Sequence, residues 1–278
     1  MRIIARLHRW WGVAFCLLFA TWFASGIVMH FVPFPARGKA AATLDRAEVH
    51  TEAAARDVAA GYGRAYGLDL SRADVERVAY DQWTVSGDYD SDRPLYRVML
   101  NDAARTELYI SSTAGDVVLV TTRRMRMLNY VGSIMHWIYP APLRHHAEAW
   151  RALVWWLSLI GAIGAGLGVV IGLARLGAAI RQKTPAYQGL LAWHHGLGLV
   201  LAPFILGWIV SGFLSLGDDW PLRSLHTFDF APLSSRPLLR SAVIVTLCLC
   251  GLAFSLTGAV LAWRMTARSP ERQAARTQ

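Results

Sequence analysis

Four long apolar stretches constrain the fold of this chain more than any other feature. They cover residues 10–31, 149–174, 190–216 and 238–263. Each is long enough to cross the hydrocarbon core of a bilayer, which takes about 20 apolar residues in a helix. The first stretch is too long for the core of a signal peptide and lacks a small-residue cleavage site, so we expect it to be retained. With 54% apolar and 17% charged residues in the whole chain, we predict an all-α membrane protein with four transmembrane helices.

The first and third stretches share residues at a constant offset of 186 positions. The matched pairs are His8 and His194, Gly12 and Gly198, Trp22 and Trp208, Ser25 and Ser211, and Gly26 and Gly212. A second set at an offset of 90 relates the flanks and interiors of the second and fourth stretches. These pairs are His136 and His226, Pro142 and Pro232, Gly161 and Gly251, and Gly168 and Gly258. Self-similarity at a fixed period predicts two pseudo-repeats of two helices each.

A domain of different composition separates the first two stretches. Residues 36–125 carry nearly balanced charges of both signs and few long apolar runs. Helix-forming residues over 51–66, ending near Gly67, predict one helix. Apolar alternation over 75–85, 95–100, 106–110 and 117–121 predicts strands of a small antiparallel sheet. We therefore divide the chain into 1–35, the α+β domain 36–125, and 126–278 with its loop 217–237 and C-terminal tail.

The distribution of basic residues predicts the orientation in the membrane. Basic residues gather before the first stretch, between the second and third, and after the fourth, and these segments together account for the whole net charge of +9. Because cytoplasmic segments are enriched in Lys and Arg, we expect both termini in the cytoplasm and residues 36–125 on the opposite side. The basic residues lie at membrane edges rather than on one folded face, which favours lipid headgroups over nucleic acid as their partner.

Several short motifs resemble one known family. The segment LYISSTAGDVVL at 108–119 resembles the closing hairpin of PepSY domains. The motifs LHRWWG at 7–12, MHWIY at 135–139, WHHGLG at 193–198 and WIVSGFLSL at 208–216 resemble the PepSY-associated transmembrane family. That family includes bacterial inner-membrane ferrisiderophore reductases that carry b-type haem. The resemblance implies a PepSY-like domain in the periplasm, an inner-membrane location and haem b.

The histidines fall at two depths of the predicted bundle. His8, with His194 or His195, lies near the cytoplasmic ends of the first and third helices. His136 and His226 lie beyond the second and fourth helices on the other side, together with His30, His145 and His146. A low-spin haem needs two axial ligands on opposite faces of the ring, and equivalent histidines on facing helices can supply them. We expect His8 with His194 to ligate one haem iron, and His136 with His226 the other.

Three further histidines are alternative cofactor-binding residues. His195 competes with His194, because neighbouring helical positions point about 100° apart and only one can face the bundle. His145 and His146 match Ser235 and Arg236 in the second repeat, so they have no histidine counterpart. They are alternative ligands or contacts for haem propionates and lipid headgroups. Histidine also sits at headgroup level without any ligand, which is the alternative for every histidine at the end of a span.

The sequence favours a dihaem b membrane reductase that passes electrons to a periplasmic acceptor, such as a ferric siderophore or another ferric complex. The chain carries no nicotinamide or flavin fingerprint after a predicted strand, so the expected donor is a quinol or a separate protein. Two alternatives are compatible with the same residues. One is a non-enzymatic, membrane-tethered PepSY regulator, and the other is an accessory subunit of an iron or haem uptake system.

Overall fold

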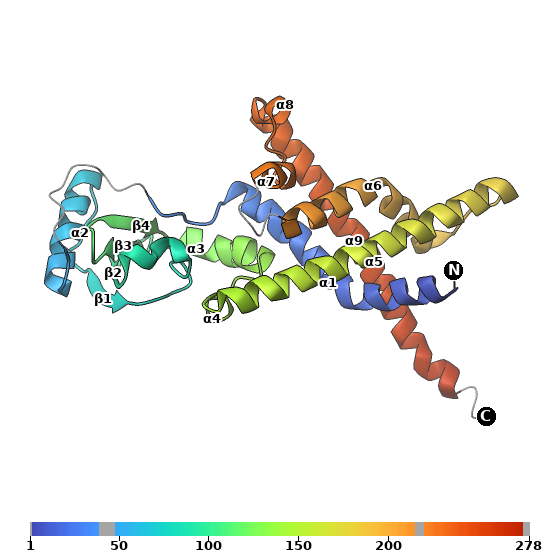
Figure 1. Ribbon diagram of the computed structural model, residues 1–278, viewed down its shortest axis with the longest axis horizontal. Helices are drawn as coiled ribbons and strands as arrows, with labels where there is room; N and C mark the ends of the chain where they lie inside the picture. Colours follow the sequence, from blue (N-terminus) through green and yellow to red (C-terminus); the bar gives the residue numbers. More distant parts are fainter. Residues whose placement is uncertain (1, 39–47, 215–219, 275–278) are drawn as a thin grey trace. The chain divides into compact units, whose positions relative to one another are not determined.

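The chain forms two compact units (Figure 1). The computed structural model describes residues 2–38, 48–214 and 220–274, with the side chains of 2–38, 48–214 and 222–264. The helical unit contains Met1–His30 and Arg151–Gln278, and the second unit, which we call the α+β unit, contains Phe31–Trp150.

Four long helices make up most of the helical unit. They are α1 (Arg2–Phe31), α5 (Ala147–Gln182), α6 (Gly189–Leu214) and α9 (Pro237–Ala274), and all four are long and apolar enough to cross a membrane. The predicted membrane protein with four spans is therefore confirmed. Two short helices, α7 (Trp220–His226) and α8 (Ala231–Ser234), lie between α6 and α9. Residues 215 and 216 of the expected third span, and the last four residues of the C-terminal tail, lie outside the described residues.

The interior of the helical unit is apolar, and so is much of its outer surface. Phe19 and Phe23 of α1 pack with Ile205 of α6 and Ile244 of α9. Large apolar side chains remain exposed along all four long helices, and Val200, for example, is 70% exposed. This is the surface that a bilayer covers, because lipid solvates apolar side chains while the helices satisfy their own backbone groups.

The α+β unit contains one helix on a four-stranded antiparallel sheet. Helix α2 spans Glu52–Tyr66, and the strands are β1 (Asp74–Val78), β2 (Leu95–Met99), β3 (Glu107–Ser111) and β4 (Val117–Thr121), paired in the order β1-β2-β3-β4. The predicted helix and small antiparallel sheet are confirmed. Shorter segments complete the unit: η1 (Gly87–Asp92), α3 (Arg123–Asn129), η2 (Tyr130–Ile134) and α4 (Ala141–Arg144).

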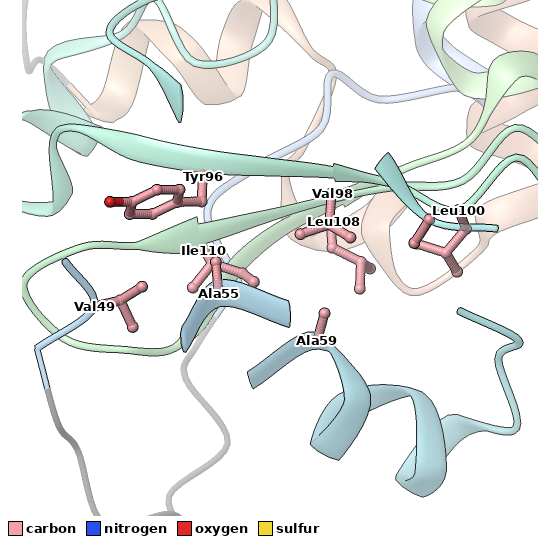
Figure 2. Packing of buried hydrophobic residues seen from close by; sticks show 9 residues of the cluster. Val49, Ala55, Ala59, Tyr96, Val98, Leu100, Leu108 and Ile110 are labelled. Carbon is pink, nitrogen blue, oxygen red and sulfur yellow. The ribbon is translucent and has the colours of Figure 1, made fainter. Parts of the chain in front are cut away.

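Helix α2 is fixed at both ends by local signals and held on the sheet by small residues. The hydroxyl of Thr51 accepts a hydrogen bond from the Ala54 amide at 3.1 Å, which caps the first turn. Gly67 ends the helix at φ 68°, a left-handed conformation that favours glycine. Ala55 and Ala59 are fully buried against Val98, Leu108 and Ile110 of the sheet, as Figure 2 shows. Their small side chains let the helix approach the strands closely.

A second apolar cluster covers the other face of the sheet. It contains Trp83, Tyr89, Leu95, Tyr109, Val118, Leu119 and Ile134. Strand β3 is consequently buried on both faces. Strand β1 ends at Val78 rather than at residue 85 as predicted, because the Asp81 carboxylate accepts hydrogen bonds from the amides of Trp83 and Thr84 at 2.9 and 3.0 Å. This turn takes the chain out of the sheet.

The α+β unit extends beyond the predicted domain at its C-terminal end. The side-chain amide of Asn129 donates to the carbonyl of Pro33 at 3.3 Å, and the Trp150 indole donates to the carbonyl of Trp137 at 3.0 Å. Residues 126–150, which the sequence grouped with the transmembrane part, belong to the same compact unit as the sheet.

Candidate functional site

A cavity of about 130 Å³ lies among the helices of the helical unit, and His8, His194 and His195 all line it. We call it the histidine cavity. Helix α1 contributes His8, Trp11 and Phe19, α5 contributes glycines and aliphatic residues, α6 contributes the other two histidines, and α9 contributes Phe254. The three histidines predicted to lie at one depth of the bundle therefore meet in space. The rest of the lining is apolar apart from Tyr187, so the imidazoles are its main polar groups.

The ring of His8 is held so that its Nε2 atom carries the lone pair. Its Nδ1 lies 3.1 Å from the carbonyl oxygen of Gly164. A carbonyl can only accept a hydrogen bond, so Nδ1 is the donor and, in the neutral ring, Nε2 is unprotonated. The ring stacks on Trp11 with centroids 6.0 Å apart. It also lies directly over Gly168, where an added Cβ would be 2.7 Å from the His8 Cε1 atom.

The ring of His194 is held in the same tautomer by a different partner. Its Nδ1 lies 2.9 Å from the Thr257 hydroxyl, which lies 2.6 Å from the carbonyl of Phe254 and donates its own proton to it. The hydroxyl must therefore accept from His194, which leaves the lone pair on Nε2. The ring stacks on Phe254 with centroids 4.6 Å apart and an interplanar angle of 14°. Among the described residues, the Nε2 atoms of His8 and His194 have no hydrogen-bond partner.

The surroundings of these two histidines fall at matched sequence offsets. His8 contacts Gly164 and Gly168, and His194 contacts Phe254 and Gly258. Phe254 lies 90 positions after Gly164, and Gly258 lies 90 positions after Gly168. An added Cβ on Gly258 would lie 3.2 Å from the His194 Cε1 atom, which parallels the contact between Gly168 and His8.

Further along α1 and α6 the correspondence continues. Ser25 and Ser211, at an offset of 186, are both buried, and each hydroxyl lies 3.2 Å from the carbonyl of its matched tryptophan, Trp22 or Trp208. The residues matched by sequence offset therefore make matched contacts.

His195 is held in the opposite tautomer. Its Nε2 lies 3.0 Å from the carbonyl of Gly172 and must donate to it, so the lone pair is on Nδ1. Its ring meets the Tyr187 ring edge to face at 5.2 Å. Both neighbouring histidines thus reach the cavity, although the prediction was that only one would face the bundle. They present different ring nitrogens, and only His194 matches His8.

The glycines of α5 and α9 allow side chains of neighbouring helices to approach closely. An added Cβ on Gly164 would lie 2.0 Å from the Trp11 indole, and one on Gly251 would lie 2.5 Å from the Phe23 ring. Such distances leave no room for a methyl group. These glycines therefore set the distance between the helices that carry the histidines.

The second predicted group is divided between the two units. His226 ends α7 in the helical unit, where its Nδ1 lies 3.1 Å from the carbonyl of Trp208 and 3.1 Å from the Ser211 hydroxyl. Burial lowers the pKa of His226, and the hydrogen bond to the Trp208 carbonyl opposes that shift. A lowered pKa keeps the imidazole neutral at physiological pH, as a metal ligand must be. In the same unit, His30 Nε2 lies 2.8 Å from the Ser241 hydroxyl.

Three histidines of that group lie in the α+β unit. His136 follows η2 and is half-buried, so its pairing with His226 of the helical unit stays a prediction. His145 and His146 directly follow α4, with ring centroids 5.4 Å apart, and His145 meets the Tyr80 ring edge to face at 4.5 Å. An aromatic contact is thus the observed environment of His145.

Sequence reasoning did not find the residues that orient the cavity histidines. Thr257 and Phe254 lie on α9 and Tyr187 lies between α5 and α6. Position 257 matches Leu167 in the first repeat, so the offset gave no signal for its hydroxyl. No protein-family model, curated protein or solved structure matches the chain.

Proposed function

We propose that this chain is a dihaem b reductase of the bacterial inner membrane, which passes electrons across the bilayer to a periplasmic ferric acceptor such as a ferric siderophore. One observation carries the proposal. His8 and His194, on different helices, line one cavity, and each presents an unprotonated Nε2 while its Nδ1 is held by a hydrogen bond. Ligating histidines are commonly oriented by such a hydrogen bond from the second ring nitrogen.

The residues of the cavity suit a haem. The imidazoles of His8 and His194 would hold the haem iron, and Trp11, stacked on His8, and Phe254, stacked on His194, would add flat apolar surfaces. A porphyrin is larger than the observed cavity of about 130 Å³, so seating it requires flexible lining side chains such as Leu199 and Leu206 to change rotamer. When bound, the haem would supply a one-electron carrier, whose potential the axial ligands and the apolar surroundings set.

The second haem is proposed from the internal repeat. The matched contacts of His8 and His194 with Gly168 and Gly258 support a two-fold relation between α1–α5 and α6–α9. The same relation pairs His136 with His226 as ligands of the second haem, near the other membrane face. The β3–β4 hairpin with its turn at Gly115 occupies the segment that resembles PepSY domains, which supports a PepSY-like assignment for the α+β unit. Lipid surrounds the helices, and no nucleic acid is involved.

Purified protein from haem-replete cells is expected to contain haem b bound without covalent attachment, because the chain has no C-x-x-C-H motif. The reduced-minus-oxidised visible spectrum with dithionite and a pyridine haemochrome assay test this, and acidified acetone should extract the haem completely. A colourless preparation would contradict the proposal and favour the non-enzymatic regulator or the uptake subunit.

Both termini are expected in the cytoplasm and the α+β unit in the periplasm, because the membrane-edge segments with the excess of Lys and Arg share one side. Alkaline phosphatase fused after Asp90 should be active, and the same reporter fused after Gln278 should be inactive. A green fluorescent protein fusion at each position provides the complementary readout. An active phosphatase at the C-terminus would overturn the orientation.

A further inference from the structure

The helical segment that precedes α4 in the α+β unit carries its apolar side chains on the outside. Helix α3 continues into η2, and the chain is helical from residue 123 to residue 136; we call this segment the 123–136 helix. Its large exposed apolar side chains are 47% to 58% accessible: Met127, Tyr130, Val131 and Met135. Met127, Val131 and Met135 follow one another at intervals of four residues, so they form one row along the helix. We call these three residues the apolar row.

The opposite side of the 123–136 helix is polar and buried. Asn129 and Ser133 are fully buried, and the Ser133 hydroxyl donates to the Asn129 side-chain oxygen at 2.9 Å. The side-chain amide of Asn129 donates to the carbonyls of Met125 and Pro33 at 3.0 and 3.3 Å. A helix on the surface of a water-soluble domain has the reverse arrangement, with its apolar side inward. The outer side of this helix therefore has the character of a contact surface.

Hydrogen bonds tie the 123–136 helix to the two points where the chain leaves and re-enters the apolar stretches. Pro33, whose carbonyl the helix binds, lies two residues after α1 and the first apolar stretch end. Trp137 directly follows the helix, and its carbonyl accepts from the indole of Trp150 in the first turn of α5. Trp150 is the second residue of the apolar stretch that begins at residue 149. These bonds hold the helix close to the ends of both membrane-spanning segments.

The aromatic residues around these hydrogen bonds are of the kind that gathers at a membrane interface. The rings of Phe34, Trp137 and Tyr139 contact one another, with centroids 5.6 to 5.7 Å apart. Tyr139 also meets the Trp150 ring edge to face at 5.5 Å. Trp and Tyr concentrate at headgroup depth, where an apolar ring and a polar atom are both accommodated.

Basic side chains begin the 123–136 helix. Arg126 is mostly buried and pairs with Glu107 at 3.2 Å. Arg123 and Arg124 are exposed, and neither forms an ion pair with a residue that the structure describes. Their charges are therefore available to anionic groups outside the α+β unit. A guanidinium group binds phosphate through several N–H donors, and phosphate is the common group of membrane lipids.

We propose that the 123–136 helix binds the membrane surface, with the apolar row inserted at the boundary of headgroups and acyl chains and with Arg123 and Arg124 on anionic headgroups. Helices that combine an apolar face with basic residues lie in the interface in this way. The contact would hold the α+β unit against the bilayer at a third place, besides its covalent links to α1 and α5. The inference goes beyond the proposed function, and neither haem nor electron transfer enters it.

Insertion of the apolar row is tested on the full-length protein in nanodiscs, with bimane attached to Met127→Cys, Val131→Cys or Met135→Cys. Phosphatidylcholine that carries a nitroxide on its acyl chain should lower the bimane fluorescence at least about twofold, because an interfacial helix buries its apolar face about 5–10 Å into the membrane. Iodide in solution should have little effect on the same labels. Labelling of the wild type gives the contribution of the native cysteines, which lie in α1 and α9.

Tyr66→Cys provides the matched control. Tyr66 is 62% exposed near the end of α2, which packs on the face of the sheet opposite to Ile134 of the 123–136 helix. Its label should respond to iodide and not to the nitroxide lipid. Quenching of the apolar row by iodide would show that the row faces water, and protection from both quenchers would show that protein covers it. Either result overturns the proposal, the second in favour of the helical unit, a second copy or another protein as the occupant.

The headgroup contact is tested with the Met127→Cys label, one helical turn from the two arginines. Nitroxide-labelled phosphatidylglycerol should quench it at least about twofold more strongly than nitroxide-labelled phosphatidylcholine at the same mole fraction, because basic residues near the surface attract anionic lipid. Arg123→Gln/Arg124→Gln should abolish this preference. Arg64→Gln/Arg72→Gln removes the same charge from other exposed positions of the α+β unit and should leave the preference unchanged. Equal quenching by the two lipids in the Met127→Cys protein, or a preference that survives Arg123→Gln/Arg124→Gln, overturns the role of the arginines.

Discussion

Replacement of His8 by alanine is expected to remove about one of two haems from the purified protein, because alanine would take away one of the two imidazoles proposed to hold that iron. His194→Ala should lose the same haem. The His8→Ala/His194→Ala double variant should therefore lose no more haem than either single variant, which is the non-additivity expected of two groups that hold one ligand. Adding His136→Ala to His8→Ala should instead remove both haems. Haem per protein is measured as pyridine haemochrome, with reduction of a periplasmic ferric chelate followed in parallel.

The matched control for this series is His50→Ala, since the His50 side chain is 75% exposed in the α+β unit. It should retain full haem content and full chelate reduction. Full haem content in His8→Ala, with loss in His195→Ala or His146→Ala, would show that the pairing is wrong. If none of these replacements changes the haem content, ligation by histidines of the cavity is excluded.

Gly164→Ala is expected to lower the stability of the helical unit by about 1–3 kcal/mol, the usual cost of overpacking a filled interior. The added Cβ would lie 2.0 Å from the Trp11 indole, which is itself held by a hydrogen bond from its Nε1 to the carbonyl of Ile160 at 2.9 Å. Trp11 therefore cannot move without losing that bond. The measurement is the Tm of the protein in detergent, followed by intrinsic tryptophan fluorescence.

Gly166→Ala provides the control two residues away on the same helix. No atom lies within 4 Å of its added Cβ, so its Tm should equal or slightly exceed that of the wild type. A Gly164→Ala protein as stable as Gly166→Ala would mean that α1 and α5 are not packed as closely as described.

The large elements of this fold were predictable because their signals are local. Helix α2 begins at a threonine cap and ends at a glycine with positive φ, and both can be read from neighbouring residues. The four membrane-spanning helices could be predicted from the length of their apolar stretches alone. The predicted end of β1 lies too far along the chain. The turn after β1 depends on hydrogen bonds from two backbone amides to the Asp81 carboxylate, and apolar alternation does not reveal them.

The candidate-site residues that belong to the internal repeat could be predicted from the sequence. His8, His194, Gly168 and Gly258 were singled out by their offsets, and the structure places each histidine against the matching glycine. Thr257 was not found, because a mid-helix threonine commonly bonds its own backbone and only the folded chain shows that it accepts from His194. The environment of His145 beside Tyr80 was also hidden, since it depends on a contact between distant segments.

The contact between His8 and the carbonyl of Gly164 has a consequence for the order of biosynthesis. It joins residues 156 positions apart in the chain. At a synthesis rate of about 5–20 residues per second, His8 exists for roughly 8–30 s before its partner helix is made. The wall formed by Phe254 of α9 arrives later still. The histidine cavity is therefore complete only near the end of translation, so the proposed haem would meet all of its binding residues only once α9 has been made.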